Sequence, residues 1–463
     1  MEDEVYADTD SDTEGANSDG SAEQPGILQV YLIQNTFGDD NYLTICYWFF
    51  IANIAAVAVI NNEGVDSEHS EDAHEDNASS SEISDFDLNL PTSHSYLGSN
   101  LEELKGRTIL DEGIYMNLPL LPMRSVVLFP GQTLPLAVFG SGVINMLDNC
   151  IQKNRTFGVV CLSDDKLEMV GTTAEIFEYT QGGEDGGFCI KAKGRQRFKI
   201  LEIIQGYSQK SANVRIMPEI TLSHPIFEQR LTSLDHRRVM LLNQKDQATF
   251  DRIRKLDAAV TAWPDWVYKH YDPQILAFKI RQNLQFIVSR GSSVPTDPTD
   301  LSFWVAQNLP LDDKERILLL EYDCVISRLQ WQLEYLTKDR ILVCSTCDKK
   351  IAKQSDIFPM SKEGPQSTFC NSSGFIHDTI TVYKAENLKL DPNPPSAEYS
   401  WFPGYAWTIA NCDGCESHMG WRFTAHKNKS LRPLSFWGLT RKGLKSRKLK
   451  KSERKLSTRS DSS

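Results

Sequence analysis

The sequence has no lysine or arginine before Lys105, although the 463-residue chain contains 49 of them. Asp, Glu, Ser and Gly dominate residues 1–25 and 62–88 instead. Segments with high net charge and little to bury cannot offset the entropy lost on folding. We therefore expect residues 1–88 to form an acidic, mostly disordered arm. A secretory signal peptide begins with positive charge, which Met-Glu-Asp-Glu does not supply, so we expect none.

One apolar run interrupts the acidic arm. Between residues 43 and 60, Thr44 and Asn53 are the only polar residues. The run is close to the minimum length of a membrane span, about 17 residues, but it has no basic flank to orient it. A membrane segment, a genuine insert and an error of the gene model, such as a retained intron, all remain open for residues 26–62. We expect no membrane association of the rest of the chain.

Cysteine is too sparse and too irregularly spaced for a secreted disulfide scaffold, with ten residues in the whole chain. Six of the cysteines are scattered, mostly in apolar runs, and we expect them to be reduced: Cys46, Cys150, Cys161, Cys189, Cys324 and Cys370. This pattern is typical of a protein of the nucleus and cytoplasm, the localisation that we expect.

The other four cysteines form two Cys-x-x-Cys pairs, Cys344 with Cys347 and Cys412 with Cys415. Zinc prefers four tetrahedral thiolates, and each pair lets one tight turn deliver two sulfurs. No open ligand position is apparent, so we expect one structural Zn²⁺. His377 and His418 are alternative ligands, and redox-active cysteine pairs are the alternative function.

The remaining pattern predicts an α+β fold in which a β-rich domain includes helices and a zinc-tied antiparallel β module follows. Alternation of apolar residues with Pro and Gly predicts strands and turns in four runs: 118–136, 156–162, 171–179 and 188–201. Gly194, inside the last run, is expected to mark a turn or bulge. Apolar residues at helical spacing predict one long helix over 318–336, and Asp312 is a plausible N-cap. The domain boundaries that we expect are 89–342 for the first domain with a helical segment at about 219–315, 343–440 for the zinc module, and 441–463 for a basic disordered tail.

Three tryptophans, Trp401, Trp407 and Trp421, lie around the second cysteine pair. Trp421 and Phe423 are two residues apart and share one face of a predicted strand. An aromatic core and a ligand pocket both explain this clustering, and composition alone does not choose between them.

The motif Ser-Trp-Phe-Pro-Gly-Tyr-Ala-Trp at residues 400–407 closely resembles that of the cereblon family, the substrate receptors of cullin-RING ubiquitin ligases. Residues 118–136 resemble the N-terminal substrate-binding domain of Lon proteases, which is the middle domain of that family. No Gly-x-x-x-x-Gly-Lys-Ser/Thr loop accompanies it, so a Lon-type ATPase and protease is not expected. The helical segment occupies the place where the family docks on the ligase adaptor, damaged-DNA-binding protein 1. The resemblance thus implies a non-catalytic receptor.

The resemblance also implies a pocket for a cyclic imide, such as a glutarimide or aspartimide at the C-terminus of a substrate protein. Thalidomide-like small molecules carry the same ring. Tyr399 stands where the best-known members have His, Ser373 replaces a further His, and Ile409 is slightly bulkier than the Val of some members. We therefore expect imide binding to rely on main-chain groups. The implied ligand-binding residues are Asn371, Tyr399, Trp401, Trp407, Trp421 and Phe423.

Two other functions are compatible with parts of the sequence. An aromatic cage can bind methylated lysine by cation–π attraction, so the tryptophans could form a methyl-lysine reader. Related zinc β folds include sulfoxide reductases, which need a further reactive cysteine, and Cys370 is the candidate. A nuclear localisation signal, a weak nucleic-acid contact and a solvated tail all remain open for the basic segment 441–463. For the protein as a whole we expect no direct nucleic-acid binding.

Overall fold

The computed structural model describes residues 84–449, apart from 99, 181–186, 207–209, 221–229, 243–246, 289–290 and 427. The chain divides into two units, Met1–His74 and Glu75–Ser463, and every described residue belongs to the second. The predicted arm up to residue 83, its apolar run and the end of the basic tail lie outside the described residues. Where the chain is described, no helix is both long and apolar enough to cross a membrane.

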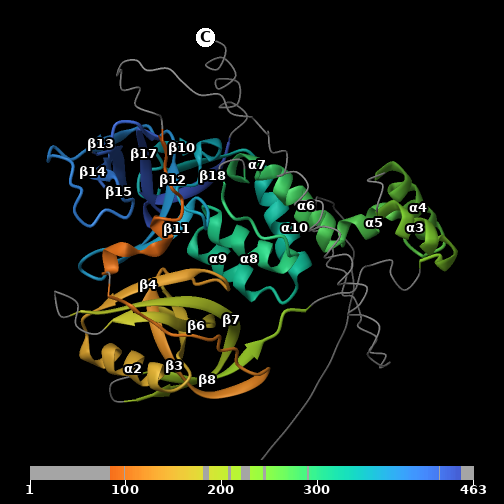
Figure 1. The fold of residues 1–463 in the computed structure, drawn as a ribbon, viewed down its shortest axis with the longest axis horizontal. Helices are drawn as coiled ribbons and strands as arrows, with labels where there is room; N and C mark the ends of the chain where they lie inside the picture. The colour runs from red at the N-terminus through yellow and green to blue at the C-terminus, as the bar shows by residue number, and fades with distance from the viewer. Residues whose placement is uncertain are drawn as a thin grey trace, which may run out of the picture. The chain divides into compact units, whose positions relative to one another are not determined.

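The predicted β-rich domain is a closed sheet (Figure 1). Its strands run in the order β2-β6-β5-β3-β8-β7-β4, and an additional pairing of β6 with β7 closes the barrel. The barrel interior has room for the ring of Phe198 because a Cβ at Gly158 or Gly171 would lie 2.8 or 2.6 Å from its Cζ. The elements are β2 (Glu102–Glu103), β3 (Gly113–Arg124), β4 (Thr133–Val138), α2 (Ser141–Gln152), β5 (Thr156–Ser163), β6 (Lys166–Thr180), β7 (Phe188–Gln205) and β8 (Lys210–Met217).

The strands predicted from alternation at 156–162, 171–179 and 188–201 are confirmed as parts of β5, β6 and β7. Gly194 lies where the β6–β7 register shifts, as predicted for a bulge. Only glycine fits at this position, because a Cβ would lie 2.3 Å from the carbonyl oxygen of Phe129. Local sequence therefore determines this part of the barrel well.

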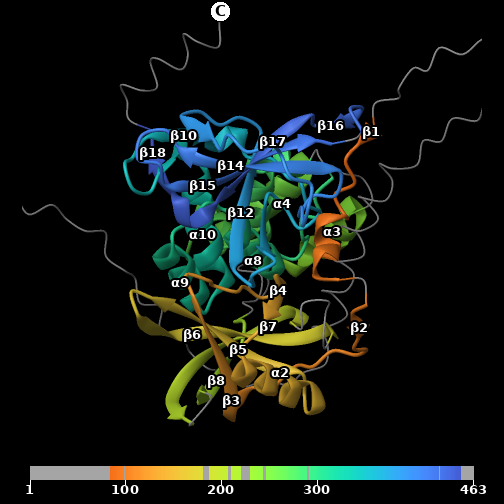
Figure 2. The ribbon, with the colours of Figure 1, turned by 90° about the vertical axis from the view of Figure 1, so that its left-hand side faces the viewer.

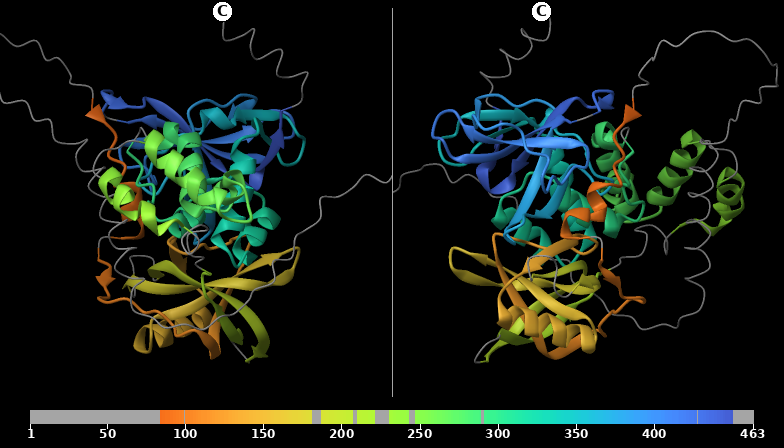
Figure 3. Two further views of the ribbon diagram at one scale, coloured as in Figure 1. Left: turned by 90° about the vertical axis from the view of Figure 1, so that its right-hand side faces the viewer. Right: turned by 60° about the vertical axis from the view of Figure 1, so that its left-hand side comes forward.

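A helical segment follows the barrel and is drawn green to blue-green in Figure 3. Its elements are η5 (Thr232–Leu234), α3 (Asp235–Leu242), α4 (Gln247–Ala259), α5 (Asp265–His270), α6 (Pro273–Asn283), α7 (Gln285–Val288), α8 (Pro298–Asn308), α9 (Asp313–Glu321) and α10 (Val325–Leu336). Asp312 is confirmed as an N-cap, since its side chain accepts from the Glu315 N–H in a full capping box. With α9 and α10, the helical segment extends to Leu336, beyond its expected limit of about residue 315.

The prediction of one long helix over 318–336 is wrong, because α9 ends at Glu321 and α10 begins at Val325. Tyr322 adopts ψ 121°, which leaves the helical range. The carbonyl oxygen of Tyr322 accepts hydrogen bonds from two buried guanidinium groups, those of Arg197 at 2.7 Å and Arg328 at 2.8 Å. Arg328 belongs to α10 itself, but Arg197 reaches this carbonyl oxygen from β7, and no local pattern reveals that distant donor.

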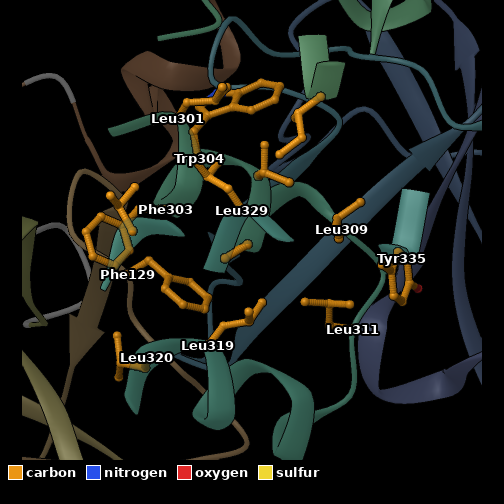
Figure 4. Packing of buried hydrophobic residues seen from close by; sticks show 14 of the residues in the cluster. Phe129, Leu301, Phe303, Trp304, Leu309, Leu311, Leu319, Leu320, Leu329 and Tyr335 are labelled. Atoms are coloured by element: carbon orange, nitrogen blue, oxygen red, sulfur yellow. The ribbon is translucent and has the colours of Figure 1, made fainter. Parts of the chain in front are cut away.

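The largest buried cluster joins the helices to the barrel (Figure 4). Phe129 of the barrel shares this cluster with Phe303 and Trp304 of α8 and with Leu319 and Leu320 of α9. In Figure 4 Phe129 lies between Phe303 and Leu319, and the Trp304 indole lies farther away. The guanidinium carbon of Arg316 lies 4.9 Å from the centre of the Phe129 ring. The helices and the barrel thus share one hydrophobic core.

The zinc module consists of two antiparallel sheets (Figure 2). A three-stranded sheet has the order β10-β9-β18, and a six-stranded sheet has the order β11-β12-β17-β15-β14-β13. The elements are β9 (Arg340–Cys344), β10 (Lys350–Lys353), η6 (Gln354–Asp356), β11 (Gln366–Cys370), β12 (Ile376–Val382), β13 (Leu388–Leu390), β14 (Tyr405–Cys412), β15 (His418–Ala425), β16 (Leu431–Arg432), β17 (Ser435–Thr440), η7 (Arg441–Gly443) and β18 (Leu444–Lys448).

The structure differs from the expected boundaries at both ends of the described chain. Residues 441–448, assigned to a disordered tail, form η7 and β18, because β18 pairs with β9 and Arg441 is buried. At the other end, β1 (Ser84–Asp85) pairs in parallel with β16, and the two lie side by side in Figure 2. The expected boundary at residue 88 therefore falls inside a segment that packs on the zinc module.

One buried cation connects the module, the helices and the barrel. Arg441 donates to Asp313 of α9 at 2.6 Å, to Asp378 of β12 at 3.2 Å and to the carbonyl oxygen of Ser125 at 2.6 Å. Burial alone would raise the pKa of Asp378, but the charges of Arg441 and of Arg316 outweigh it and hold that pKa below its usual value. The ionised carboxylate is therefore a fixed part of this junction.

Candidate metal centre and aromatic pocket

The four predicted zinc ligands converge, and their sulfur atoms all lie within 4.8 Å of one another. Cys344 Sγ lies 3.6 Å from Cys415 Sγ, and Cys347 Sγ lies 3.5 Å from Cys412 Sγ. Zinc–sulfur bonds of about 2.3 Å in a tetrahedron place sulfurs about 3.8 Å apart. The donor set therefore fits a single structural zinc ion, as predicted.

Each Cys-x-x-Cys pair folds into the same turn. The N–H of Asp348 donates to the carbonyl oxygen of Cys344 at 3.0 Å, and the N–H of Glu416 donates to that of Cys412 at 2.9 Å. Both Asp348 and Glu416 have φ 59°, in the left-handed region. Two copies of one local structure, at the ends of β9 and β14, thus supply two thiols each.

The histidines considered as alternative ligands lie elsewhere. The ring of His377 lies 5.1 Å from the ring of Trp421, and the ring of His418 lies 4.9 Å from it on centroid distances. Burial lowers the pKa of both imidazoles, that of His377 to about 4. Both are neutral at neutral pH and pack as part of the aromatic region. Neither histidine belongs to the cysteine cluster found among the described residues.

The aromatic residues predicted to share one face do so. β14 pairs with β15 so that Trp407 is opposite Phe423 and Ile409 is opposite Trp421. Residues directly opposite in an antiparallel pair point to the same side of the sheet. Phe423 is 1% exposed and packs in the aromatic core, whereas Trp407 and Trp421 are only partly buried. Phe423 is therefore a core residue, whereas Trp407 and Trp421 keep part of their surface exposed.

Trp401 comes from the loop before β14 and meets this face edge-on. Its ring lies 4.7 Å from that of Trp421 with an interplanar angle of 75°. Phe369 of β11 stacks on the other side of Trp401 at 4.9 Å and 7°. The Nε1–H of Trp401 donates to the carbonyl oxygen of Cys370, and the Nε1–H of Trp407 donates to that of Glu398. Both indoles thus have their polar atoms satisfied.

Tyr399 lies at a strained turn two residues before Trp401. It directly follows Glu398, whose carbonyl oxygen accepts from Trp407. It adopts φ 50°, which a bulky residue rarely does, and its side chain is 53% exposed. Within the described part of the chain, neither the Tyr399 carbonyl oxygen nor the Trp401 N–H has a hydrogen-bond partner. The turn therefore leaves a main-chain acceptor and a main-chain donor beside the tryptophans.

Asn371 lies in the turn between β11 and β12, directly after Cys370, whose carbonyl oxygen accepts from Trp401. Its side-chain oxygen accepts from the N–H groups of Ser373 at 3.1 Å and Phe375 at 2.8 Å. The amide oxygen thus stabilises the turn itself. Phe375 is 67% exposed at this turn.

Sequence reasoning missed Phe369, and it assigned His377 and His418 only to a metal. The available signal was weak. His377 and Phe369 are opposite each other in the β11–β12 pair, but that pairing is visible only once the register is known. An exposed Phe at 375, within a short polar turn, was the local feature that could have marked this edge.

Family models match two parts of the chain. Residues 117–338 match the model described as the ATP-dependent protease La (LON) substrate-binding domain. Residues 340–459 match the model described as Yippee zinc-binding/DNA-binding/Mis18, centromere assembly. A solved structure, the Lon N-terminal domain protein from Xanthomonas campestris, is 19% identical and covers 48% of this chain and 99% of its own, with a TM-score of 0.31.

Curated relatives match most of the chain. Protein cereblon from Gallus gallus is 43% identical over 378 residues, which cover 78% of this chain and 84% of the relative. Protein cereblon from Danio rerio is 40% identical, with 82% and 93% covered, and that from Xenopus tropicalis is 39% identical, with 86% and 93% covered.

Proposed function

Because the chain belongs to the cereblon family of substrate receptors, we propose that it is the substrate-recognition subunit of a cullin-RING ubiquitin ligase. In this proposal the pocket of Trp401, Trp407 and Trp421 binds the cyclic imide at the C-terminus of a substrate protein, and the ligase partners then transfer ubiquitin. The observation that carries the proposal is the left-handed turn at Tyr399, which presents free main-chain groups next to the indoles.

The chemistry of a glutarimide matches this arrangement. Its methylene groups suit aromatic walls, while its imide N–H needs an acceptor and its carbonyl groups need donors. The Tyr399 carbonyl oxygen and the Trp401 N–H are the groups available for those bonds. An unpaired buried polar group costs about 1–3 kcal/mol, so a ring that satisfies both groups is preferred over a hydrocarbon of the same shape.

A receptor function is also favoured over catalysis by the state of the thiols. The four cysteines of the centre form a closed set suited to a structural ion. Cys370, the candidate for a sulfoxide reductase, is fully buried, and burial raises the pKa of its thiol to about 11. A protonated, inaccessible thiol is a poor nucleophile.

The helical segment supports docking on an adaptor, which we propose to be damaged-DNA-binding protein 1. Trp263, in the loop between α4 and α5, is 57% exposed, and Trp266 of α5 is 70% exposed. Phe278 of α6 is 60% exposed. Large aromatic residues dominate the energetics of protein interfaces. Exposing several of them on neighbouring helices is expected of a docking surface. A pulldown of the adaptor by the parent chain, lost in Trp266→Ala, tests this assignment.

The pocket is tested by titrating a fluorescent glutarimide into the parent chain, into Trp407→Ala and into Trp437→Ala. Trp437 is the matched control, since it lies on β17 on the opposite face, with the Arg422 guanidinium carbon 5.6 Å from its ring centre. We expect Trp407→Ala to abolish binding and Trp437→Ala to retain it. Equal binding by Trp407→Ala and the parent would reject the pocket. Displacement of the probe by a trimethyl-lysine peptide would favour a methyl-lysine reader instead.

We further propose that the protein is located in the nucleus and cytoplasm, in keeping with free thiols at the cysteines between residues 84 and 449. A fluorescent fusion observed in living cells tests this proposal, and its accumulation in a membrane compartment would contradict it.

A further inference from the structure

Residues 84–97, here called the anchor segment, lie far upstream of the zinc module in sequence but pack on it. Phe86 is 7% exposed, and its ring meets that of Tyr405 edge-on at 5.4 Å. The N–H of Lys362 donates to the carbonyl oxygen of Leu88 at 2.9 Å. Neither family model includes the anchor segment, since the first begins at residue 117 and the second at residue 340.

The end of the anchor segment forms two short helices, η2 (Pro91–Ser93) and η3 (Ser95–Leu97), joined at His94. His94 is 3% exposed and adopts φ 47°. The hydroxyl of Tyr96 lies 2.8 Å from His94 Nδ1 and accepts a hydrogen bond from the N–H of Cys370 at 3.2 Å. The hydroxyl proton is thus available to Nδ1 of a neutral imidazole, and burial lowers the pKa of His94 to about 4.

Cys370 and its neighbour Phe369 are the residues against which Trp401 rests. They end β11, which is the edge strand of the six-stranded sheet. The outward N–H of Cys370 has no partner strand, and Tyr96 supplies its acceptor. The carbonyl oxygen of Cys370 accepts from Trp401 Nε1 at 3.2 Å, and Phe369 stacks on the Trp401 ring.

The anchor segment also contacts Phe369 directly. The ring of His94 lies 5.9 Å from that of Phe369, and the ring of Tyr96 lies 6.4 Å from it. Both supports of Trp401, the stacked ring and the accepting carbonyl, are therefore fixed by residues of the anchor segment.

We propose that His94 and Tyr96 are positioning residues of the imide pocket, which hold the wall formed by Trp401 through Phe369 and Cys370. The recognition unit is then discontinuous and consists of residues 84–97 together with the zinc module. This inference rests on the proposed function for its ligand, a cyclic imide, and on the packing alone for the position of Trp401.

The test is Tyr96→Phe in the full-length chain, which removes one oxygen atom and leaves the ring in place. Binding of a fluorescent glutarimide is expected to weaken about tenfold, because the Cys370 N–H and His94 both lose their partner. In ¹⁵N NMR spectra, the Nε1–H resonance of Trp401, assigned from its loss in Trp401→Phe, is expected to shift and to exchange faster with solvent.

Tyr405→Phe is the matched control. It also removes a buried hydroxyl from the aromatic core, one that donates to the carbonyl oxygen of Pro433 at 2.7 Å. It should lower the unfolding midpoint as much as Tyr96→Phe while leaving the glutarimide affinity and the Trp401 resonance as in the parent.

Three outcomes would overturn the inference or separate it from the proposed function. Parent-like binding and a parent-like Trp401 resonance in Tyr96→Phe would overturn it. Equal loss of affinity in both variants would also overturn it, since Tyr96 would then act only through stability. If the parent chain does not bind glutarimide, the proposed function fails, and the Trp401 resonance in Tyr96→Phe alone decides whether Tyr96 positions that indole.

Discussion

The metal centre and the proposed aromatic pocket lie in one small module but are built in different ways. Each half of the metal centre is a six-residue turn closed by two main-chain hydrogen bonds of its own, and the two turns are alike. The pocket instead takes Trp401 from a loop, Trp407 from β14, Trp421 from β15 and a support from β11. The metal centre needs only that its two locally formed turns meet. An assembled site depends on the whole fold, including the distant anchor segment.

The largest effect should follow from breaking the local site. We expect Cys412→Ser to release zinc and unfold the module, because structural zinc binding contributes about 10–16 kcal/mol. Zinc content by mass spectrometry and the near-ultraviolet circular dichroism of the tryptophans measure the loss. Cys370→Ser, in the same module but outside the centre, should retain zinc. A folded, zinc-free Cys412→Ser protein would show that the module does not depend on the ion.

A smaller effect should follow from breaking the long-range junction. Asp378→Asn leaves Arg441 and Arg316 without a full counter-charge, and removing one partner of a buried pair costs about 3–5 kcal/mol. Because the pKa of Asp378 is lowered in the folded protein, its contribution is present above its usual pKa of 3.8 and is lost as the pH falls through the lowered value.

Urea unfolding between pH 3 and pH 6 measures that loss. Asp413→Asn is the control, because Asp413 pairs with Lys349 at the surface beside the metal centre, where a pair contributes at most about 1 kcal/mol. Equal effects of the two variants would remove the distinction between the local and the assembled site.

Acidification should destabilise the folded protein through His377, which packs against Trp421. Burial lowers the pKa of His377 in the folded protein to about 4, so folding favours the neutral imidazole. As the pH falls from about 6.5 toward 4, the unfolded chain binds the proton more readily than the folded one, and the free energy of unfolding decreases. With allowance for solvent at this half-buried site, we expect about 1–2 kcal/mol. Unfolding curves across this range measure it, and His377→Phe should make the slope shallower; His94 and His418, whose pKa values burial also lowers, supply the rest. A slope as steep in that variant as in the parent would assign the whole effect to those other groups.

The smallest effect concerns the side chain at the strained turn. Tyr399→His restores an imidazole donor while keeping the main-chain groups, and one added hydrogen bond of about 1 kcal/mol corresponds to a severalfold gain in glutarimide affinity. Isothermal titration with glutarimide measures it. Unchanged affinity would show that the main chain alone determines imide binding. Tyr399→Phe is the control, because it adds no donor.

Local features were the predictable part of the fold. The barrel strands β5, β6 and β7, the bulge at Gly194 and the cap at Asp312 were read from nearby residues. The prediction of a single long helix over 318–336 was wrong, because the Tyr322 carbonyl oxygen accepts from Arg197 of the distant strand β7 as well as from Arg328 of α10. Helical spacing continues through the break, so a periodic pattern cannot reveal it.

The candidate site shows the same division. The Cys-x-x-Cys spacing was sufficient to predict all four zinc ligands, because each turn is formed by consecutive residues. The three tryptophans were predicted as a group, but whether each one is core or surface was not. Burial depends on the register of β14 with β15 and on the approach of the loop that carries Trp401.

By itself, the sequence determined the metal centre, the type of each domain and the clustering of the three tryptophans, because these depend on residues close together in the chain. Only the tertiary structure decided that β18 extends the module, that α9 and α10 are separate and that His94 and Tyr96 support Trp401 through β11. The physical reason is that the partner of an edge-strand N–H, or of a buried carbonyl, can come from any part of the chain. Chain folding selects that partner through packing, which spacing and composition do not record.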